Sequence, residues 1–305
     1  MDYKDKIAFI TGGAHGAAFG QAQYFGRLGC RIFIVDIRGD ALEAALEKLR
    51  AEGIEAHGAQ MDLMDREAYA RVADQVEDIY GGPPELLFNT AGVFAHGPTE
   101  ASTYEDFDWV MGVNLNGVIN GMVTFVPRMI KAGRPGYIVS TSSMGGFGGH
   151  DGTALYSAAK SAVISLMESY REALAKYDIG VSVLCPANIN TNIALSSDTR
   201  PAHLGKSGYV VNEESKQALK DIYQHGMDPL ELAENVHKGI EANQLYILPY
   251  PEVKEMVAAY FNNILKAFPP LESDPEGAKK RTEALMEWGQ KRRHIFTQKS
   301  KDAPV

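Results

Sequence analysis

Tyr156 and Lys160 are the two residues whose types and spacing most clearly suggest chemistry. They lie four apart at the start of a predicted helix, YSAAKSAVISLMESYREALAKY, so both side chains project from one face of it. A phenol has a pKa near 10, and it acts as a base near neutral pH only if neighbouring positive charge stabilises the phenolate by about 4 kcal/mol. The spacing alone fits an exposed tyrosine over a lysine stem equally well.

Ser143 and Asn114 extend this pair to a set of four. Ser143 ends a predicted strand thirteen residues before Tyr156, and Asn114 lies in the preceding helical segment. The hydroxyl could hold a substrate oxygen, the phenol could exchange its proton, the ammonium could set the phenol's pKa, and the amide could anchor a water path. This combination predicts hydride transfer at an alcohol or ketone carbon.

A glycine-rich turn, TGGAHGAAFG (residues 11–20), joins the first predicted strand to a helix. Gly12, Gly13 and Gly16 permit tight turning and a close approach of the backbone to a diphosphate, which the free N–H groups of a helix N-terminus attract. Taken alone, these glycines could merely connect strand to helix. Their position after the first strand favours a dinucleotide-binding turn.

Asp36 ends the second predicted strand, twenty-four residues after Gly12. A carboxylate there can accept hydrogen bonds from both hydroxyls of an adenosine ribose and would repel a 2′-phosphate, so NAD is favoured over NADP. Arg38 and His15 favour NADP, because a cation near either position could receive that phosphate. Asp36 should decide the preference, because it occupies the strand end itself.

The elements that must position these residues alternate between short apolar runs and longer helical patterns. This βαβ rhythm predicts an α/β fold: a single doubly wound parallel sheet of the Rossmann type, with about seven strands, helices on both faces and a helical C-terminal extension. The predicted strands cover residues 6–11, 31–36, 54–60, 85–92, 136–143, 180–187 and 245–250.

The rhythm breaks after Pro186, where a polar, irregular stretch begins. We expect residues 1–250 to form the dinucleotide-binding and catalytic domain, in which residues 188–228 act as a mobile cover over the substrate. Residues 251–305 read as a helical extension of the same domain, with a basic end.

Composition limits the partners. The net charge of -9 argues against general affinity for nucleic acid or anionic membrane, and we expect no segment of membrane-spanning length and no signal peptide, hence a cytoplasmic protein. The two cysteines, Cys30 and Cys185, adjoin apolar runs and are predicted to be buried free thiols, so no metal site is expected. The expected partner is a small molecule.

With these motifs the sequence resembles the short-chain dehydrogenase/reductase family over roughly residues 5–250. The resemblance implies that Asp62 and Leu63 meet the adenine, that residues 89–92 border the cofactor, and that Lys160 also holds the nicotinamide ribose. It implies a homodimer or homotetramer formed through the helices at 103–130 and 155–177. The cofactor-binding set becomes Gly12, His15, Gly16, Ala17, Asp36, Asp62, Leu63, Asn89, Ala91, Gly92, Tyr156, Lys160, Ile189 and Thr191.

The sequence departs from the family pattern at three positions. Ala18 replaces the third glycine of the turn, Thr90 replaces the second asparagine of Asn-Asn-Ala-Gly, and Ala187 replaces the glycine of Pro-Gly. Each replacement is a small residue, so we expect altered packing around the diphosphate rather than lost binding. The four proposed catalytic residues are retained, which argues against a non-enzymatic member.

Stretches outside the general motifs, at 113–130, 246–253 and 272–278, are similar to bacterial Cα-dehydrogenases that oxidise the benzylic alcohol of lignin-derived β-aryl ether dimers with NAD. This similarity implies a bulky aromatic alcohol as substrate and a ketone as product. The glycine-rich loop after Ser143 leaves room for rings, although it could equally be a flexible loop with a core phenylalanine. The predicted substrate contacts are Phe94, Met144, Phe147, Asn188 and Asn192.

Two alternatives remain open from the sequence. One is a reductase of steroids or other bulky ketones from the same family. The other, from a different class, is a non-catalytic NAD-binding regulatory protein, which would bind the cofactor but oxidise no alcohol. The sequence does not decide the preferred enantiomer, the physiological direction, dimer against tetramer, or whether the extension covers its own active site or a partner's.

Overall fold

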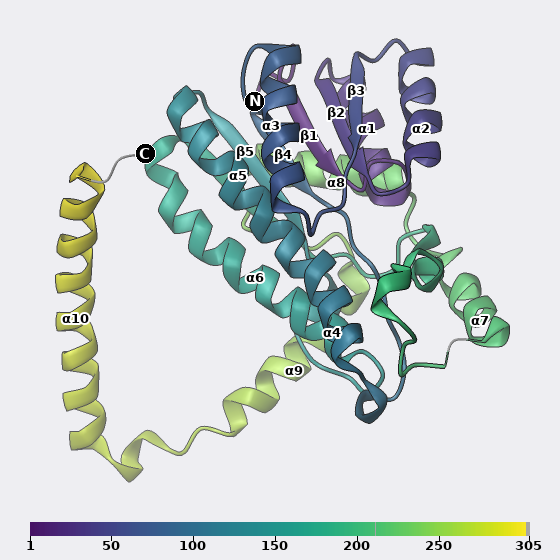
Figure 1. Ribbon diagram of the computed structural model, residues 1–305. Coiled ribbons are helices and arrows are strands. Elements are labelled where there is room, and N and C mark those ends of the chain that lie inside the picture. The colour runs from purple at the N-terminus through teal and green to yellow at the C-terminus, as the bar shows by residue number, and fades with distance from the viewer. Residues whose placement is uncertain (211, 303–305) are drawn as a thin grey trace. The chain divides into compact units, whose positions relative to one another are not determined.

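Seven strands form one parallel sheet in the order β3-β2-β1-β4-β5-β6-β7. The computed structural model describes residues 1–210 and 212–302, with side chains to residue 292 (Figure 1). The predicted doubly wound α/β sheet is confirmed. The strands are β1 (Ile7–Thr11), β2 (Arg31–Asp36), β3 (Ala56–Gln60), β4 (Leu86–Asn89), β5 (Gly136–Thr141), β6 (Ile179–Leu184) and β7 (Tyr246–Ile247).

Helices cover both faces of this sheet, as its fully buried central strands require. Side chains alternate along each strand, so Leu87 packs in a cluster with α3, α5 and α6, whereas Phe88 meets Phe25 of α1 with ring centroids 4.8 Å apart. The helices of the catalytic unit are α1 (Gly16–Arg27), α2 (Gly39–Ala51), α3 (Arg66–Tyr80), α4 (Tyr104–Met111), α5 (Gly117–Ala132), α6 (Ala154–Leu174), α7 (Glu213–Tyr223) and α8 (Pro229–Glu241).

A π-helical turn, Gly112–Asn116, joins α4 to α5. The continuous helix Tyr104–Ala132 is 29 residues long with a mean hydropathy of 1.3, so by length and composition it could cross a membrane, and the expectation that no segment reaches this length was wrong. Buried residues make up 61% of its most apolar window, because α5 packs against the sheet as a core helix. Such π turns often occur at functional positions.

The segment between β6 and α8 is irregular, as predicted. It contains the 3-10 helices Asn192–Thr199 and Ala202–Leu204 and the helix α7. Its ends are tied together, because Asn190 N–H donates to Met227 O (3.0 Å) and Met227 N–H donates to Asn188 O (2.9 Å). The residues between them therefore form a long loop whose two ends lie side by side, next to the carboxyl end of β6.

The chain divides into two units, Met1–Pro251 and Glu252–Val305. The second unit contains α9 (Lys254–Lys266) and α10 (Pro275–Asp302), so the predicted helical character of the extension is confirmed for the described residues. Its assignment to the same domain stays a prediction. In the first unit, Cys30 and Cys185 are buried free thiols, and burial raises the pKa of each to about 12.

Candidate active site

The turn between β1 and α1 needs glycine at specific positions. Gly12 and Gly16 have φ of +72° and +55°, and a Cβ would lie 2.9 Å from Ala91 at the first and 2.8 Å from Thr191 Cγ2 at the second. In α1, which is described throughout, the N-cap residue His15 makes no side-chain cap and the first turn carries no acidic residue. Its free N–H groups therefore favour an anion at this end.

Asp36 lies at the end of β2, beside this turn. Its carboxylate accepts hydrogen bonds from the N–H groups of Ala14 (3.2 Å) and Arg38 (3.1 Å). The Arg38 guanidinium lies on the His15 ring, with Nη2 2.7 Å from Nδ1 and 3.0 Å from Nε2. Burial, together with this cation, lowers the pKa of His15, which disfavours its charged form. The two residues that argue for NADP therefore meet each other next to Asp36.

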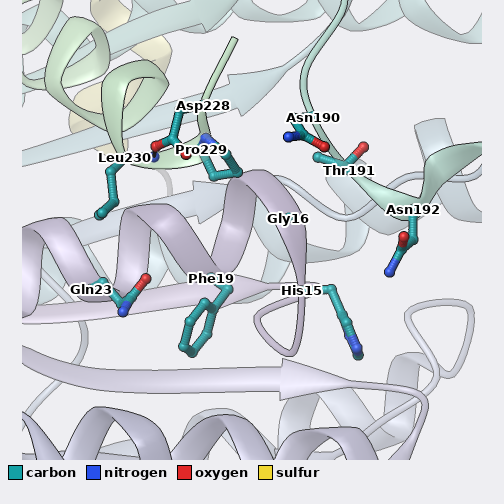
Figure 2. A pocket seen from close by; sticks show the side chains of 10 residues that line it. All are labelled: His15, Gly16, Phe19, Gln23, Asn190, Thr191, Asn192, Asp228, Pro229 and Leu230. Carbon is teal, nitrogen blue, oxygen red and sulfur yellow. Dashed lines mark hydrogen bonds between the residues drawn. The ribbon is translucent and has the colours of Figure 1, made fainter. Parts of the chain in front are cut away.

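A cavity of about 250 Å³ opens at the N-terminus of α1 (Figure 2). Three segments surround it: the start of α1, residues 190–192 after β6, and the start of α8. It brings together four predicted cofactor or substrate residues, namely His15, Gly16, Thr191 and Asn192. It also includes residues that the sequence did not single out: Phe19, Gln23, Asn190, Asp228, Pro229 and Leu230.

The residues after β3 and β4 border the same edge of the sheet. Asp62 accepts a hydrogen bond from the N–H of Met64 (2.9 Å), and the carbonyl of Leu63 accepts one from Asn120 of α5 (2.8 Å). Thr11 Oγ1 at the end of β1 accepts hydrogen bonds from the N–H groups of Thr90 (2.9 Å) and Ala91 (3.1 Å). These contacts fix two predicted cofactor-binding segments to neighbouring elements.

Asn89 and Ile189, two further predicted cofactor contacts, make their own fixed interactions. The Asn89 amide donates to Ser140 Oγ (3.1 Å) and is buried in the sheet. Ile189 forms an isolated parallel bridge with Met227 at the start of α8. Ala17, the second residue of α1, adjoins the turn. All three lie at places that can support a dinucleotide, and their contact with one stays a prediction.

The four proposed catalytic residues come together at the carboxyl end of the central strands. Gly92 lies between two of them, because a Cβ on it would be 3.1 Å from Asn114 Oδ1 and 3.4 Å from Lys160 Nζ. Ser143 is close enough to Tyr156 to lower its pKa, and Lys160 Nζ lies 5.7 Å from the centre of the Tyr156 ring. The set can therefore act on one substrate oxygen.

Local structure holds each member of this set. The π turn presents Asn114, whose amide exchanges two hydrogen bonds with the backbone of Val93, accepting at 2.8 Å and donating at 2.9 Å. Lys160 Nζ donates to the carbonyl of Thr141 (2.8 Å) at the end of β5. The amide and the ammonium are thus fixed before any substrate arrives, which is the arrangement that favours catalysis.

Burial shifts the titration of the Tyr156 and Lys160 pair. It raises the pKa of Tyr156 to about 12, with an opposing effect from the Ser143 hydrogen bond and a further increase from Tyr223. Burial also lowers the pKa of Lys160 to about 8. In the chain alone, the pKa of the phenol is raised and not lowered as the sequence predicts, because burial disfavours the phenolate.

The predicted substrate residues fall in different surroundings. Phe94 lies directly at the site, with its ring edge-on to Tyr156 at 5.0 Å between centroids and its N–H bonded to Ser196 Oγ (3.0 Å). Met144 and Phe147 pack against the main core cluster, and the Phe147 ring lies 6.5 Å from that of Tyr246. The Phe147 contacts match the alternative of a core phenylalanine.

Asn188 and Asn192 flank the loop after β6. The carbonyl of Asn188 accepts hydrogen bonds from Tyr250 Oη (2.8 Å) and from the N–H of Met227. Asn192 begins a 3-10 helix and lines the cavity of Figure 2. Among the side chains that the structure describes, those of residues 1–210 and 212–292, no group of three or more His, Cys, Asp or Glu could hold a metal ion.

Residues 6–201 match the family model described as short chain dehydrogenase. The chain belongs to this family. The family assignment confirms the predicted class of enzyme, an oxidoreductase.

This short-chain dehydrogenase is also similar to individual proteins. It is 58% identical over 300 residues to the C alpha-dehydrogenase of Sphingobium sp. (strain NBRC 103272 / SYK-6), covering 98% of each chain. The crystal structure of the LigD apo form from Sphingobium sp. strain SYK-6 matches with a TM-score of 0.76 and 51% identity, over 88% of this chain and 100% of that one. A short-chain dehydrogenase/reductase from Burkholderia phymatum in complex with NAD matches with a TM-score of 0.83 and 29% identity, over 88% and 98%.

Ser196 and Tyr223 are site residues that the sequence analysis missed. Ser196 lies in the irregular stretch after β6, where no periodicity or motif marks a position, and Tyr223 ends the helix α7. Ser196 is 6% exposed and anchors Phe94, and Tyr223 influences the titration of Tyr156. These residues reach the site only through the tertiary folding of the chain between β6 and α8. The amino-acid sequence alone does not predict that folding.

Proposed function

We propose that this chain is an NAD-dependent dehydrogenase that oxidises the benzylic Cα alcohol of a lignin-derived β-aryl ether dimer to the ketone. The observation that carries the proposal is the 58% identity with C alpha-dehydrogenase over 98% of both chains. That similarity continues past residue 201, where the family model ends, and so includes the cover and the extension. We assign substrate preference to these parts.

The residues at the β1–α1 turn fit NAD. The free N-terminus of α1 and the close packing at Gly12 and Gly16 suit a diphosphate, and Asp36 offers its carboxylate to the adenosine ribose. When bound, the dinucleotide supplies the hydride acceptor. The remaining contacts with it are assigned to His15, Ala17, Asp62, Leu63, Asn89, Ala91, Gly92, Tyr156, Lys160, Ile189 and Thr191.

Ser143 and Tyr156 act on the alcohol oxygen. The serine hydroxyl orients it, and the phenolate of Tyr156 takes its proton at Oη. Lys160 acts as an ammonium that stabilises the phenolate, so its protonated form is the active one. Asn114 holds the helical turn beside Lys160. We assign the aromatic part of the substrate to Phe94, Met144 and the asparagines Asn188 and Asn192, with Phe147 supporting the loop from the core.

The test is NADH formation, followed by absorbance, from separately supplied enantiomers of a β-aryl ether dimer and from a simple steroid alcohol. We expect turnover of the dimer and little of the steroid. Faster turnover of the steroid, or a preference for NADPH with a bulky ketone, would instead indicate the reductase alternative. NAD binding without oxidation of either alcohol would indicate the regulatory alternative.

The variant Tyr156→Phe tests the proton-transfer role. Loss of the phenol hydroxyl should reduce kcat by a factor of about 10² to 10⁴, with NAD binding nearly unchanged. Tyr104→Phe is the matched control, because Tyr104 is 88% exposed and lies outside the site. Retention of wild-type turnover by Tyr156→Phe would refute the assignment.

We also propose a cytoplasmic homo-oligomer, a dimer or a tetramer. Supporting it, the outer surface of α4 and α5 exposes Phe107 (43%) and Val123 (63%), apolar side chains that pairing would cover. Sedimentation or light scattering of the purified protein measures the state directly. A monomer at micromolar concentration would contradict this proposal and leave the catalytic one unaffected.

A further inference from the structure

A second, smaller apolar cluster lies behind the proposed active site. It combines the irregular segment after β6 with α4 and the start of α6. Val93, Val113 and Leu155 belong to it, and each comes directly before a residue of the site. A shift of the cluster would therefore move three parts of the site at once. Its buried members are Trp109, Val110, Leu155 and Tyr209.

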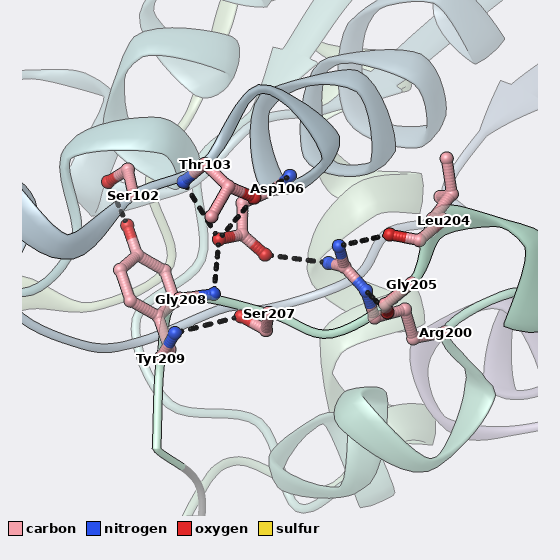
Figure 3. A network of polar contacts seen from close by, with 9 residues as sticks. All are labelled: Ser102, Thr103, Asp106, Arg200, Leu204, Gly205, Ser207, Gly208 and Tyr209. Carbon is pink, nitrogen blue, oxygen red and sulfur yellow. Dashed lines mark hydrogen bonds and ion pairs between the residues drawn. The ribbon is translucent and has the colours of Figure 1, made fainter.

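A fully buried carboxylate, Asp106 of α4, holds the irregular segment onto this cluster (Figure 3). It accepts hydrogen bonds from the N–H of Thr103 (3.1 Å) and from the N–H of Gly208 (3.0 Å), and it pairs with Arg200 Nη1 at 2.7 Å. Burial opposes ionisation, but hydrogen bonds from Ser207 and the backbone, together with the guanidinium, lower the pKa of Asp106. The carboxylate is therefore charged and fully partnered.

The guanidinium of Arg200 also has several partners. Its guanidinium donates to the carbonyls of Leu204 (3.3 Å) and Gly205 (3.3 Å) and lies 5.4 Å from the centre of the Trp109 ring. The side chain is 10% exposed, against 0% for Asp106. Removing one member of such a pair leaves a buried charge without a partner, which strongly destabilises the arrangement around it.

Close packing next to the pair restricts the same segment. A Cβ at Gly208 would lie 1.8 Å from the carbonyl oxygen of Ala101, so only glycine fits there. Tyr209 Oη hydrogen-bonds with Ser102 Oγ at 2.7 Å (Figure 3). Residues 200–209 are thus fixed to the stretch that leads into α4.

A continuous series of contacts runs from this pair to the reacting phenol. Arg200 directly follows the 3-10 helix Asn192–Thr199, and Ser196 on that helix accepts the N–H of Phe94 at 3.0 Å. Phe94 then meets the Tyr156 ring edge-on, with centroids 5.0 Å apart at 85°. The position of the 3-10 helix therefore sets the position of the aromatic side chain beside Tyr156.

The ion pairs of Lys216 on the same segment differ in kind. Lys216 of α7, 16% exposed, pairs with Asp198 at 2.6 Å and with Glu213 at 3.4 Å, but these carboxylate side chains are 53% and 89% exposed. Pairs with an exposed partner contribute little to stability, because water and salt screen them. α7, which the structure describes completely, has no buried residue. The Asp106–Arg200 pair is thus the desolvated anchor, and Lys216 provides a matched control on the same segment.

We propose that Asp106 and Arg200 are positioning residues for the reaction: their buried ion pair fixes the 3-10 helix at 192–199 and, through Ser196 and Phe94, the aromatic wall against which the alcohol's ring lies. This inference rests on the proposed function for the identity of the substrate. It predicts that the pair governs substrate binding more strongly than cofactor binding, because most of the assigned cofactor contacts lie on other elements and Thr191 is only the N-cap of the 3-10 helix.

The experiment compares the full chain with Asp106→Asn, Arg200→Lys and Lys216→Met. The readouts are KM and kcat for the β-aryl ether alcohol, the Kd for NAD, and hydrogen exchange of the Phe94 amide. For Asp106→Asn we expect KM at least tenfold higher, Phe94 exchange at least tenfold faster and NAD Kd within twofold. Arg200→Lys, which keeps the charge, should lie between this variant and wild type, and Lys216→Met should match wild type.

Wild-type KM and Phe94 exchange in both Asp106→Asn and Arg200→Lys would overturn the proposal. Faster Phe94 exchange with unchanged KM would also overturn it, because the pair would then act on local structure only. If Asp106→Asn does not fold, Arg200→Lys decides. If the wild-type enzyme oxidises no β-aryl ether alcohol, the proposed function fails, and the Phe94 exchange of the variants still tests whether the pair positions the site.

Discussion

The buried Lys160 should make the stability of the protein depend on alkaline pH. Its side chain is 3% exposed, and burial lowers its pKa from the ordinary 10.5 to about 8. Between these values the unfolded chain binds a proton that the folded chain does not. Stability contributed by the neutral lysine is therefore present above pH 10.5 and is lost as pH falls through about 8.

The size of this effect follows from the two pKa values. Each pH unit between them changes the free energy of unfolding by up to about 1.4 kcal/mol, so the titration of Lys160 alone should cost about 2 kcal/mol when pH falls from 10 to 7. Cys30 and Cys185, whose pKa values burial raises from 9.0 to about 12, act in the opposite direction above pH 9, so the effect of Lys160 is measured as a difference from a variant without it. Below pH 7 the lysine is protonated in both states and the cost stays constant. Burial raises the pKa of Tyr156 from 10 to about 12, so that residue lowers stability only above pH 10.

Urea unfolding of the cofactor-free protein at pH 7, 8, 9 and 10 measures the effect. Lys160→Met removes the titration and leaves an apolar chain of similar length. Relative to this variant, the wild type should gain about 2 kcal/mol from pH 7 to pH 10. Lys131→Met, at an exposed position at the end of α5, should run parallel to the wild type. A difference between wild type and Lys160→Met that is constant over this range would refute the reasoning.

Two further predictions concern the cofactor turn. Asp36→Ala should lower the preference for NAD over NADP by at least tenfold, because the ribose loses a hydrogen-bond acceptor while Arg38 and His15 remain to meet a 2′-phosphate. Initial rates with each dinucleotide measure the preference. An unchanged ratio of the NAD rate to the NADP rate would exclude the role assigned to Asp36. Gly16→Ala should weaken NAD binding about tenfold or more, because the φ of Gly16 is +55° and the new Cβ would lie 2.8 Å from Thr191 Cγ2. Fluorescence titration with NADH gives the Kd of the variant. A Kd equal to that of the wild type would contradict the steric argument.

The features that the sequence predicted well are those fixed by the backbone. Short apolar runs such as 7–10 and 86–88 predict buried strands, and the positive φ at Gly12 favours the residue type seen there. Asp36 ends β2 and Ser143 lies two residues after β5, and parallel strands end at one edge. The sequence therefore predicts that both residues lie at the same edge of the sheet.

The buried ion pair between Asp106 and Arg200 could not be predicted from the sequence. Asp106 lies three residues after Thr103, so its local pattern predicts only a capping box, which the structure indeed contains. Its second role depends on Arg200, 94 residues away, in a segment with no periodicity. Likewise, an aromatic residue after a glycine-rich loop could face a substrate or the core, and the contacts of Phe147 with Tyr246 and the main cluster depend on tertiary packing.

The sequence also fails to predict the direction in which the pKa of Tyr156 is shifted. A lysine four residues away on one helical face supplies attraction, which spacing reveals, but burial removes water from both groups, which spacing does not reveal. Desolvation raises the pKa of Tyr156 and lowers that of Lys160, so each change favours the neutral pair over the charged one. In the cofactor-free chain, deprotonation of Lys160 near pH 8 would therefore precede that of Tyr156, and under the proposed mechanism this would remove the charge that stabilises the phenolate. The rate of alcohol oxidation by the chain should therefore depend on keeping Lys160 protonated.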